Sequence, residues 1–461
     1  MLSLSSHRRW LVAGFCLIAL LFAVQSTWFL QNLGRHTLRQ TPLDADACKQ
    51  TAPSWISPSS YLNFPHPTTK AKDNLRNDSY YVTAFAIAGF TNEFIGAMQL
   101  IYLGILTQRI PILAPIIPAA HVSEHAGNLD FGDVFNLTTL RDTLRYPILE
   151  WRDVKTLSPN VSILDSTDRD DPALESLGCW STQKRTFDEP NGSIESENVL
   201  KLDLSYTRVP PFAFLNAQDE DEMFVTLSGL AAAIQPRYPH PGTKNLPLMM
   251  ESRFGAKMEP DEQLACFDLM FYASTGVRQY EFEDRWSPVW NRVGTHLRFN
   301  EGLVDLTKEY IRRALGIEEG GDIPPMVTVH IRRGDFENHC KAGETPPCFI
   351  PNSRFKKAVE DIQARLLESR NINASHVLVA SDEDDPAFWD EIASFGWSYL
   401  DHEAERTYER FGEWYPVLID KVAQSMSIGF VGSLSSTFSL LSARRVEDWN
   451  GGETAMLSFY D

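Results

Sequence analysis

Hydrophobic positions along this chain follow two patterns, one typical of buried strands and the other of amphipathic helices. YYVTAFAIA at 80–88 is an apolar run, the turn GFTNEF follows, and EFIGAMQLIYLGILTQ at 93–108 has helical periodicity. IPILAPI at 110–116 is a second apolar run. Strand, glycine turn, helix and strand in this order predict a βαβ unit.

The C-terminal third repeats this alternation. Apolar runs and amphipathic patterns predict strands at 326–331, 376–380, 397–400 and 428–432, and helices at 353–370, 386–395, 415–426 and 438–448. A helix at 301–315 leads into the series. Strands that alternate with helices predict a parallel sheet covered on both faces, as in a Rossmann-like domain.

The predicted fold class is therefore α/β, with two Rossmann-like halves facing a cleft. We expect the N-terminal half at 79–315 and the C-terminal half at 316–461. The region from about 120 to 290 mixes short apolar runs with acidic and Pro-rich loops, and its strands cannot be ordered from the pattern. A length of 461 residues fits two packed halves or two to three domains.

The segment at 10–30 contains no charged residue. As a helix it would rise about 32 Å, close to the thickness of one hydrocarbon core. Arg8 and Arg9 precede it, which favours a cytosolic N-terminus, and Trp10 and Trp28 lie where interfacial aromatic residues belong. These features predict a signal-anchor transmembrane helix that gives a single-pass type II protein.

A cleaved signal peptide, with Ser26 at the cleavage site, is the alternative. We favour the uncleaved anchor because the apolar segment is long and tryptophans bracket it. Residues 1–9 then form a cytosolic tail, and residues 31–78, rich in Pro, Ser, Thr and Asn, form a stem. Either reading sends the rest of the chain into the secretory pathway. The anchor favours the Golgi membrane, with the endoplasmic reticulum as the alternative.

Composition agrees with a globular luminal protein. The chain is 43% hydrophobic and 22% charged, and its net charge of -19 disfavours nucleic acid as a partner. N-x-[ST] glycosylation motifs occur at Asn77, Asn136, Asn160, Asn191 and Asn373.

Six cysteines are present, of which Cys16 lies in the apolar segment. The remaining five are an odd number, so at least one is free or paired between chains. Cys340 and Cys348 bracket a short Pro-containing loop and are the expected disulfide. No spacing resembles a zinc site.

Two adjacent arginines, Arg332 and Arg333, follow the strand at 326–331, whose end carries His330. Ligands of open α/β sheets bind beyond the carboxyl ends of the strands, and an arginine fork suits two phosphate oxygens. Gly334 then lets the backbone approach closely. The alternatives are a surface ion pair for the arginines and a satisfied core histidine for His330. Arg333-Gly334-Asp335 also spells an adhesion tripeptide, which we set aside because a strand end is poorly placed for an exposed adhesion loop.

Other strand ends carry groups that suit a nucleotide. Ser436 and Thr437 open a helix after the strand at 428–432, and helix N-termini bind anions. Asp382, after the strand at 376–380, can accept from a ribose hydroxyl or a guanine N–H edge. A plain helix cap and a solvated acidic turn are the alternatives. Together these groups suit a nucleotide diphosphate, although neither G-x-G-x-x-G nor an ATP P-loop motif occurs.

Four segments resemble, in order, the motifs of the fucosyltransferase superfamily that includes protein O-fucosyltransferases, α1,6-fucosyltransferases and a rhizobial nodulation enzyme. HIRRGDF resembles its H-x-R-[R] motif, and AGFTNEF its G-x-x-N-Q segment. VASDEDD resembles the [ST]-D strand end, and FVGSLSSTFS the late F-[IV]-G-x-x-x-S-x-F-S segment. The resemblance implies an inverting, metal-independent glycosyltransferase with a GT-B-like fold. It implies GDP-fucose as the donor substrate, with no cofactor.

By position, the resemblance implies that Arg332 binds the diphosphate and stabilises the leaving GDP, while Arg333 assists or holds the loop. It implies that His330 orients the residues around the diphosphate and that Asp382 contacts the nucleoside. The remaining implied donor-binding residues are Ser436, Thr437 and Phe438. Asn92 would lie in the cleft near donor and acceptor.

Glu93 departs from the motif, which often has Gln at this position. Its carboxylate is a candidate general base, or alternatively a helix-start acid favoured by the helix dipole. Asp335 and Glu337 are the other nearby carboxylates. The acceptor, a protein or glycan hydroxyl, is not specified by the sequence. A transferase for another GDP-sugar and a catalytically inactive luminal glycan- or protein-binding homologue remain as alternatives.

Overall fold

The computed structural model describes residue 55 and residues 57–85, 88–119, 121–157, 168–184, 194–338 and 348–459. All of them belong to one compact unit of the chain. The expected anchor at 10–30 lies outside these residues and stays a prediction. Within the ranges that the structure describes, no helix combines the length and apolarity needed to cross a membrane.

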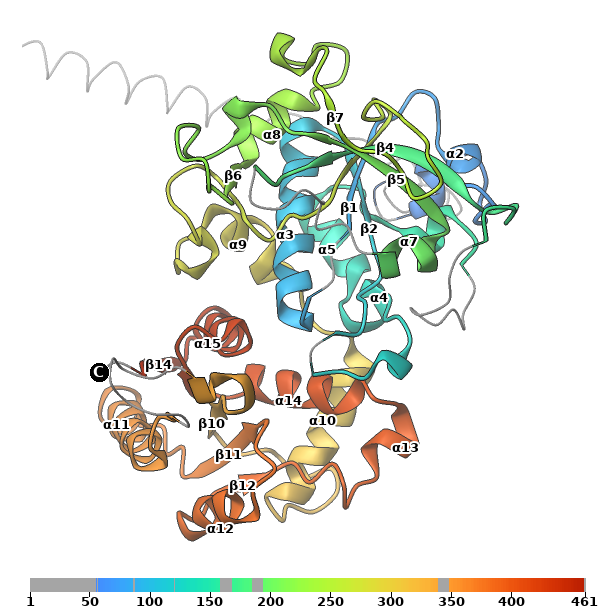
Figure 1. The fold of residues 1–461 in the computed structure, drawn as a ribbon. Helices are drawn as coiled ribbons and strands as arrows, with labels where there is room; N and C mark the ends of the chain where they lie inside the picture. Colours follow the sequence, from blue (N-terminus) through green and yellow to red (C-terminus); the bar gives the residue numbers. More distant parts are fainter. Residues whose placement is uncertain are drawn as a thin grey trace, which may run out of the picture. The chain divides into compact units, whose positions relative to one another are not determined.

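The predicted βαβ unit is present in the N-terminal part. Strand β1 (Tyr81–Ala84), helix α3 (Phe90–Thr107) and strand β2 (Ile110–Leu113) follow one another, and β1 pairs with β2 in parallel. The helix ends where Gln108 adopts a left-handed conformation. Figure 1 shows α3 running along this sheet toward the C-terminal part of the chain.

Five more strands complete a seven-stranded sheet in the order β3-β2-β1-β8-β4-β5-β7. They are β3 (Leu149–Glu150), β4 (Glu175–Ser181), β5 (Leu202–Arg208), β7 (Leu248–Met250) and β8 (Leu264–Phe267). All pairs are parallel except β5 with β7. The region that the sequence pattern left unordered therefore supplies most of this sheet.

Short elements connect these strands. The helices are α4 (Phe131–Val134), α5 (Leu137–Leu144), α6 (Trp151–Val154), α7 (Ile194–Leu200), α8 (Leu227–Ala233) and α9 (Pro288–Arg292). Strands β6 (Val225–Thr226) and β9 (Ala273–Ser274) form a separate pair.

A second sheet in the C-terminal third is parallel throughout, in the order β12-β11-β10-β13-β14. Its strands are β10 (Met326–Ile331), β11 (His376–Ser381), β12 (Ser398–Tyr399), β13 (Gly429–Ser433) and β14 (Glu453–Leu457). Its helices are α11 (Asn352–Arg370), α12 (Pro386–Ser394), α13 (Thr407–Phe411), α14 (Tyr415–Ser425) and α15 (Thr437–Asn450). The predicted α/β class with parallel sheets is confirmed, and β14 is a strand that the pattern did not predict.

We call the part built on the seven-stranded sheet, residues 57–300, the N-terminal half, and residues 301–459 the C-terminal half. Helix α10 (Glu301–Ala314) packs against α14 of the C-terminal half. Leu62, Ala71 and Leu75 are buried in the core of the N-terminal half, so part of the segment that we assigned to the stem packs onto the folded body. The predicted boundary at 315/316 stays a prediction.

Helix α15 joins the two halves (Figure 1). Asp448 on this helix accepts a hydrogen bond from Nε1 of Trp290, at 2.5 Å, and Trp449 donates to the carbonyl of Thr295, at 2.8 Å. Arg445 is fully buried among aromatic rings of both halves, with its guanidinium 4.9 Å from the ring centre of Phe94. These contacts fix the C-terminal part of α15 relative to the N-terminal half.

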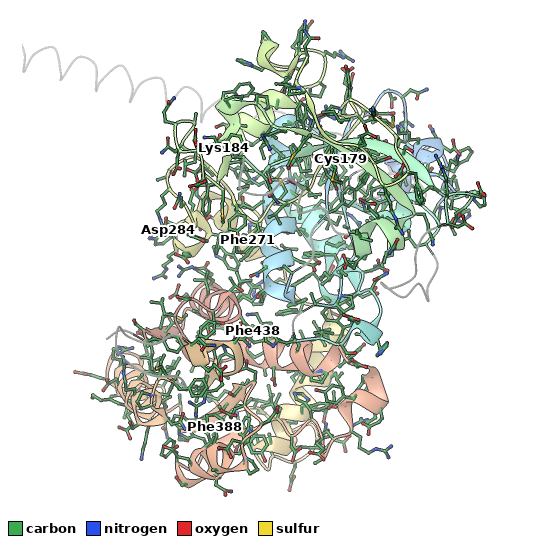
Figure 2. The ribbon with its side chains drawn as sticks, viewed as in Figure 1. Cys179, Lys184, Phe271, Asp284, Phe388 and Phe438 are labelled. Carbon is green, nitrogen blue, oxygen red and sulfur yellow. A yellow bond between two sulfur atoms is a disulfide. The ribbon has the colours of Figure 1, made fainter. Side chains whose placement is uncertain are left out.

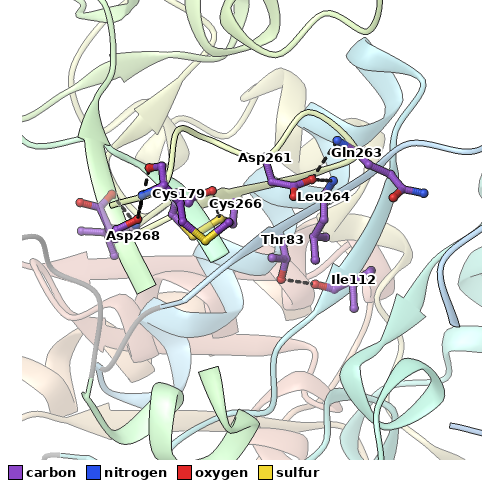
Figure 3. The surroundings of a disulfide bond; sticks show 12 residues. Thr83, Ile112, Cys179, Asp261, Gln263, Leu264, Cys266 and Asp268 are labelled. Carbon is purple, nitrogen blue, oxygen red and sulfur yellow. Dashed lines mark hydrogen bonds between the residues drawn. A yellow bond between two sulfur atoms is a disulfide. The ribbon is translucent and has the colours of Figure 1, made fainter. Parts of the chain in front are cut away.

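One disulfide, unpredicted from the sequence, joins Cys179 in β4 to Cys266 in the adjacent strand β8, with 4.8 Å between their Cα atoms (Figure 3). The sequence offered no signal for this pair, because 87 residues separate the two cysteines. Cys348 is also disulfide-bonded. Cys340 lies outside the described residues, so its pairing with Cys348 stays a prediction.

Candidate functional site

A cavity of about 460 Å³ lies between the two halves, at the carboxyl ends of β10, β11 and β13 and the start of α3. Every predicted site residue except Glu93 and Arg333 lines it. The predicted residues that it brings together are Asn92, His330, Arg332, Asp382, Ser436, Thr437 and Phe438. Segments more than 300 positions apart in the sequence thus meet at one site, where a ligand of nucleotide size can bind.

Arg332 is held in the cavity wall by hydrogen bonds to several groups. Its guanidinium donates to Oδ2 of Asp382 through NH1, and NH2 pairs with Oδ1 of Asp335 at 2.7 Å. NH2 also donates to Nε2 of His121, and the backbone N–H donates to Oγ of Ser433 at 3.0 Å. The side chain is 13% exposed, so the fork is oriented and still reachable from the cavity.

Asp382 organises the loop that follows β10. Its Oδ1 accepts the backbone N–H of Arg333 at 2.7 Å while Oδ2 accepts from Arg332. Gly334 has a φ of 39°, and a Cβ there would lie 2.7 Å from Oδ2 of Asp382. Glycine is therefore required at this position by both the backbone conformation and the space available.

Arg333 points away from the cavity. Its guanidinium lies 4.2 Å from the ring centre of Phe349 and 4.8 Å from that of Phe388, with Nε 3.2 Å from a carboxylate oxygen of Glu383. Consecutive residues that leave a strand point to opposite sides, which explains why only one of the two arginines faces the cavity. The structure places Arg333 in a supporting position behind the loop.

His330 is buried at the end of β10. Its Nδ1 lies 2.7 Å from Oγ of Ser439, and its ring lies 4.8 Å from the ring of Phe438. Burial, together with the positive charges of Lys421 and Arg332, lowers the pKa of His330 well below its usual value. The imidazole is therefore neutral and positions α15 relative to β10.

The start of α15 forms another part of the wall. Ser435 has a φ of 68°, and Oγ of Ser436 caps the helix by accepting from the N–H of Ser439 at 3.3 Å. The hydroxyl of Thr437 donates to Oδ1 of Asn92 at 2.8 Å and lies 2.8 Å from the hydroxyl of Thr91. The first N–H groups of a helix have no partner within the helix, so this end favours an anion.

Glu93 does not line the cavity. Its carboxylate accepts the backbone N–H groups of Ala88 at 3.3 Å and Ile117 at 3.2 Å, which ties the turn before α3 to the segment after β2. Burial of the carboxyl group raises its pKa well above the usual value. The geometry thus gives Glu93 a positioning task.

Replacing Glu93 by glutamine is expected to leave the rate of the reaction at this site within about threefold of the wild type. The amide oxygen of the glutamine can still accept a hydrogen bond from one of the two backbone N–H groups. Loss of a true general base would instead lower the rate by about 10²–10⁴-fold. Measuring turnover of Glu93→Gln at saturating donor checks this. A drop of about 100-fold, with unchanged thermal stability, would restore Glu93 as the base.

Sequence reasoning missed several residues that line the cavity. His121 contacts Arg332 in the cavity wall, and burial followed by the charge of Arg332 lowers its pKa. Asp420 lines the cavity and accepts from Nε2 of His402 at 3.2 Å. Other missed side chains include Phe271, Tyr280, Phe282 and Glu283. They lie in loops or helices without a strand-end signal, so no local pattern could have found them.

In the part of the chain that the structure describes, no cluster of three or more His, Cys, Asp or Glu residues has an arrangement suited to holding a metal ion. The groups that face the cavity are instead one guanidinium, a helix start, hydroxyl groups and carboxylates.

Comparison with solved structures identifies similar folds. The chain is similar to the apo-form crystal structure of POFUT1, with 13% identity, a TM-score of 0.49, and coverage of 83% of this chain and 99% of that chain. It is also similar to POFUT1 in complex with GDP-fucose, with 15% identity, a TM-score of 0.48, and coverage of 82% of this chain and 98% of that chain. A third similar structure is the fucosyltransferase NodZ from Bradyrhizobium, with 12% identity, a TM-score of 0.37, and coverage of 79% of this chain and 92% of that chain.

No protein-family model matches the chain, and no curated protein matches it.

Proposed function

We propose that this protein is a glycosyltransferase that transfers fucose from GDP-fucose to a hydroxyl group of a protein or glycan. The observation that carries the proposal is the convergence of Arg332 and the start of α15 on one cavity. A guanidinium and a helix N-terminus are both anion-binding groups, so together they suit the two phosphates of a diphosphate. The motifs shared with the fucosyltransferase superfamily support fucose as the sugar.

The proposed mechanism assigns the leaving group to the wall of the C-terminal half. As the bond between the sugar and the β-phosphate breaks, negative charge grows on the phosphate oxygen. Arg332 is fixed by Asp382 and His121, so it can stabilise that charge without reorganising. The transfer then proceeds with inversion and without a metal ion.

The carboxylates beside Arg332 are compatible with this assignment. The side chain of Asp335 is 64% exposed, so a diphosphate can replace it on NH2 of Arg332. Asp382 keeps its bond to the backbone of Arg333 and holds the loop while the donor binds. Ser436, Thr437 and Phe438 contact the phosphates or the base. Asn92 of the N-terminal half lies beside them, because its Oδ1 accepts from the hydroxyl of Thr437 at 2.8 Å.

The rest of the proposal concerns location. We place the protein in the membrane of the Golgi or the endoplasmic reticulum as a single-pass type II protein with a luminal body. The uncharged segment at 10–30 supports this, and so does the Cys179–Cys266 disulfide, since such bonds persist in oxidising compartments.

Calorimetric titration of the purified protein with GDP and GDP-fucose in EDTA tests the donor site. We expect metal-free binding of both ligands, with UDP as the control nucleotide that binds at least about tenfold more weakly. Binding of GDP-mannose as tight as that of GDP-fucose would favour a transferase for a different GDP-sugar. Failure of folded protein to bind GDP would contradict the proposal and favour an inactive glycan- or protein-binding homologue.

A further inference from the structure

Four carboxylates line the cavity among the described residues, and their partners differ. Asp335 and Asp382 are both paired with Arg332, and Asp420 accepts from His402 at 3.2 Å. Within the described part of the chain, the cation near the carboxylate of Glu283 is NH1 of Arg278, at 3.9 Å. Its carboxylate is therefore the one of the four least engaged by a positive group.

Glu283 is also the one of these carboxylates that comes from the N-terminal half. It ends a 3-10 helix at Glu281–Glu283 and shares its part of the cavity wall with Phe271, Tyr280 and Phe282. Among the residues labelled in Figure 2, Phe271 is the one of the N-terminal half drawn nearest to Phe438 of the C-terminal half. The cavity lies between the two halves, so the N-terminal half contributes the wall with Glu283, and the C-terminal half contributes Arg332 and the start of α15.

The backbone of Glu283 is fixed from both sides of the cavity. Its N–H donates to the carbonyl of Tyr280 at 2.9 Å, and its carbonyl accepts from the guanidinium of Arg444 on α15. Glu281 secures the same loop by accepting from the backbone N–H and the hydroxyl of Thr275, both at 2.6 Å. The helix that starts at the diphosphate site therefore also positions Glu283.

We propose that Glu283 is the catalytic base that deprotonates the acceptor hydroxyl. The inference rests on the proposed function. With the diphosphate held by the C-terminal half, inversion requires the acceptor to approach from the side of the N-terminal half, where Glu283 is the carboxylate in the wall. The acceptor oxygen forms a bond to the anomeric carbon, the bond from that carbon to the β-phosphate oxygen breaks with its electron pair leaving on GDP, and the acceptor proton moves to Glu283.

The surroundings of Glu283 favour this role. The side chain of Glu283 is 46% exposed. Partial burial raises its pKa above the usual value, the charge of Arg278 lowers it, and the charge of Asp284 raises it. The guanidinium of Arg444 donates to the carbonyl of Glu283 and pairs with Glu447. Arg332 lies in the wall of the C-terminal half, and His121 of the N-terminal half pairs with it. A carboxylate with a raised pKa is a stronger base once it is ionised at neutral pH.

The test compares Glu283→Gln with Glu409→Gln, a surface variant whose carboxylate lies 3.9 Å from Arg406 and outside the cavity. Water serves as the acceptor, so the rate is GDP release from GDP-fucose. We expect Glu283→Gln to lower this rate by about 10²–10⁴-fold with unchanged affinity for GDP. The control should match the wild type.

A pH profile separates a base from a merely structural residue. In the wild type the rate should rise with pH to a plateau, with a midpoint above the usual pKa of glutamate, and this rise should be absent in Glu283→Gln. Glu283→Asp, which keeps a titratable carboxylate, should retain the rise. Normal GDP release by Glu283→Gln, or no GDP release by wild-type protein that binds the donor, overturns the inference. Absence of GDP binding in the wild type instead overturns the proposed function.

Discussion

Replacing Arg332 by alanine is expected to lower the rate of fucose transfer by about 10²–10³-fold, because a fixed cation at the developing phosphate charge is lost. The variant also leaves Asp335 and Asp382 without their guanidinium, so negative charge then faces the diphosphate. Affinity for GDP should therefore fall together with turnover. Both quantities can be measured on the same preparation, by calorimetry and by GDP release.

Two further variants interpret that result. Arg332→Lys keeps the positive charge but loses the two-pronged guanidinium. Compared with Arg332→Ala, it should therefore recover part of the GDP affinity and a smaller part of the transfer rate. Arg313→Ala removes an arginine that pairs with Glu405 outside the cavity and should leave both quantities unchanged. If Arg332→Ala kept full turnover and full GDP affinity, the donor site would have to lie elsewhere.

The local elements of the fold could be predicted because each has its own periodicity. The strand at 326–331 matches β10, and the helix at 353–370 matches α11 within one residue. The order of strands in the seven-stranded sheet could not be predicted. Strand β8 lies between β1 and β4, although about 180 residues separate it from β1 along the chain. Such pairing is decided by packing over long distances, which no short window of sequence records.

The candidate site, like the fold, could be predicted only in part. The wall formed by the C-terminal half was predictable, because Arg332, Asp382 and Thr437 each follow a strand of a parallel sheet. The direction of side chains was not, so Arg333 and Glu93 were expected in the cavity but lie outside its lining. Glu283 was missed because it belongs to a loop that reaches the cavity only through the fold of the N-terminal half.

The cysteine pattern shows the same limit. An odd number of cysteines outside the apolar segment indicated at least one unpaired or intermolecular thiol, and proximity in sequence favoured Cys340 with Cys348. Cys179 and Cys266 are distant in sequence but become neighbours through the pairing of β4 with β8.

Replacing Cys179 and Cys266 together by alanine is expected to lower the free energy of unfolding by about 4–5 kcal/mol. The bond closes a loop of 87 residues, and the loss of that constraint enlarges the conformational entropy of the unfolded chain. Both side chains are fully buried in the core of the N-terminal half, so small cavities add to the loss. Urea denaturation of the wild type and of the double variant under oxidising conditions measures the difference in their free energies of unfolding.

A matched comparison separates the bond from the cavities. Under reducing conditions that open the disulfide in the unfolded state, the wild type should lose most of its advantage over the double alanine variant, and only the smaller packing difference should remain. The cavity that contains Arg332 includes neither cysteine, so the folded variant should keep its affinity for GDP. A stability difference below about 1 kcal/mol in oxidising buffer would mean that β4 and β8 are held together by the sheet and its core alone.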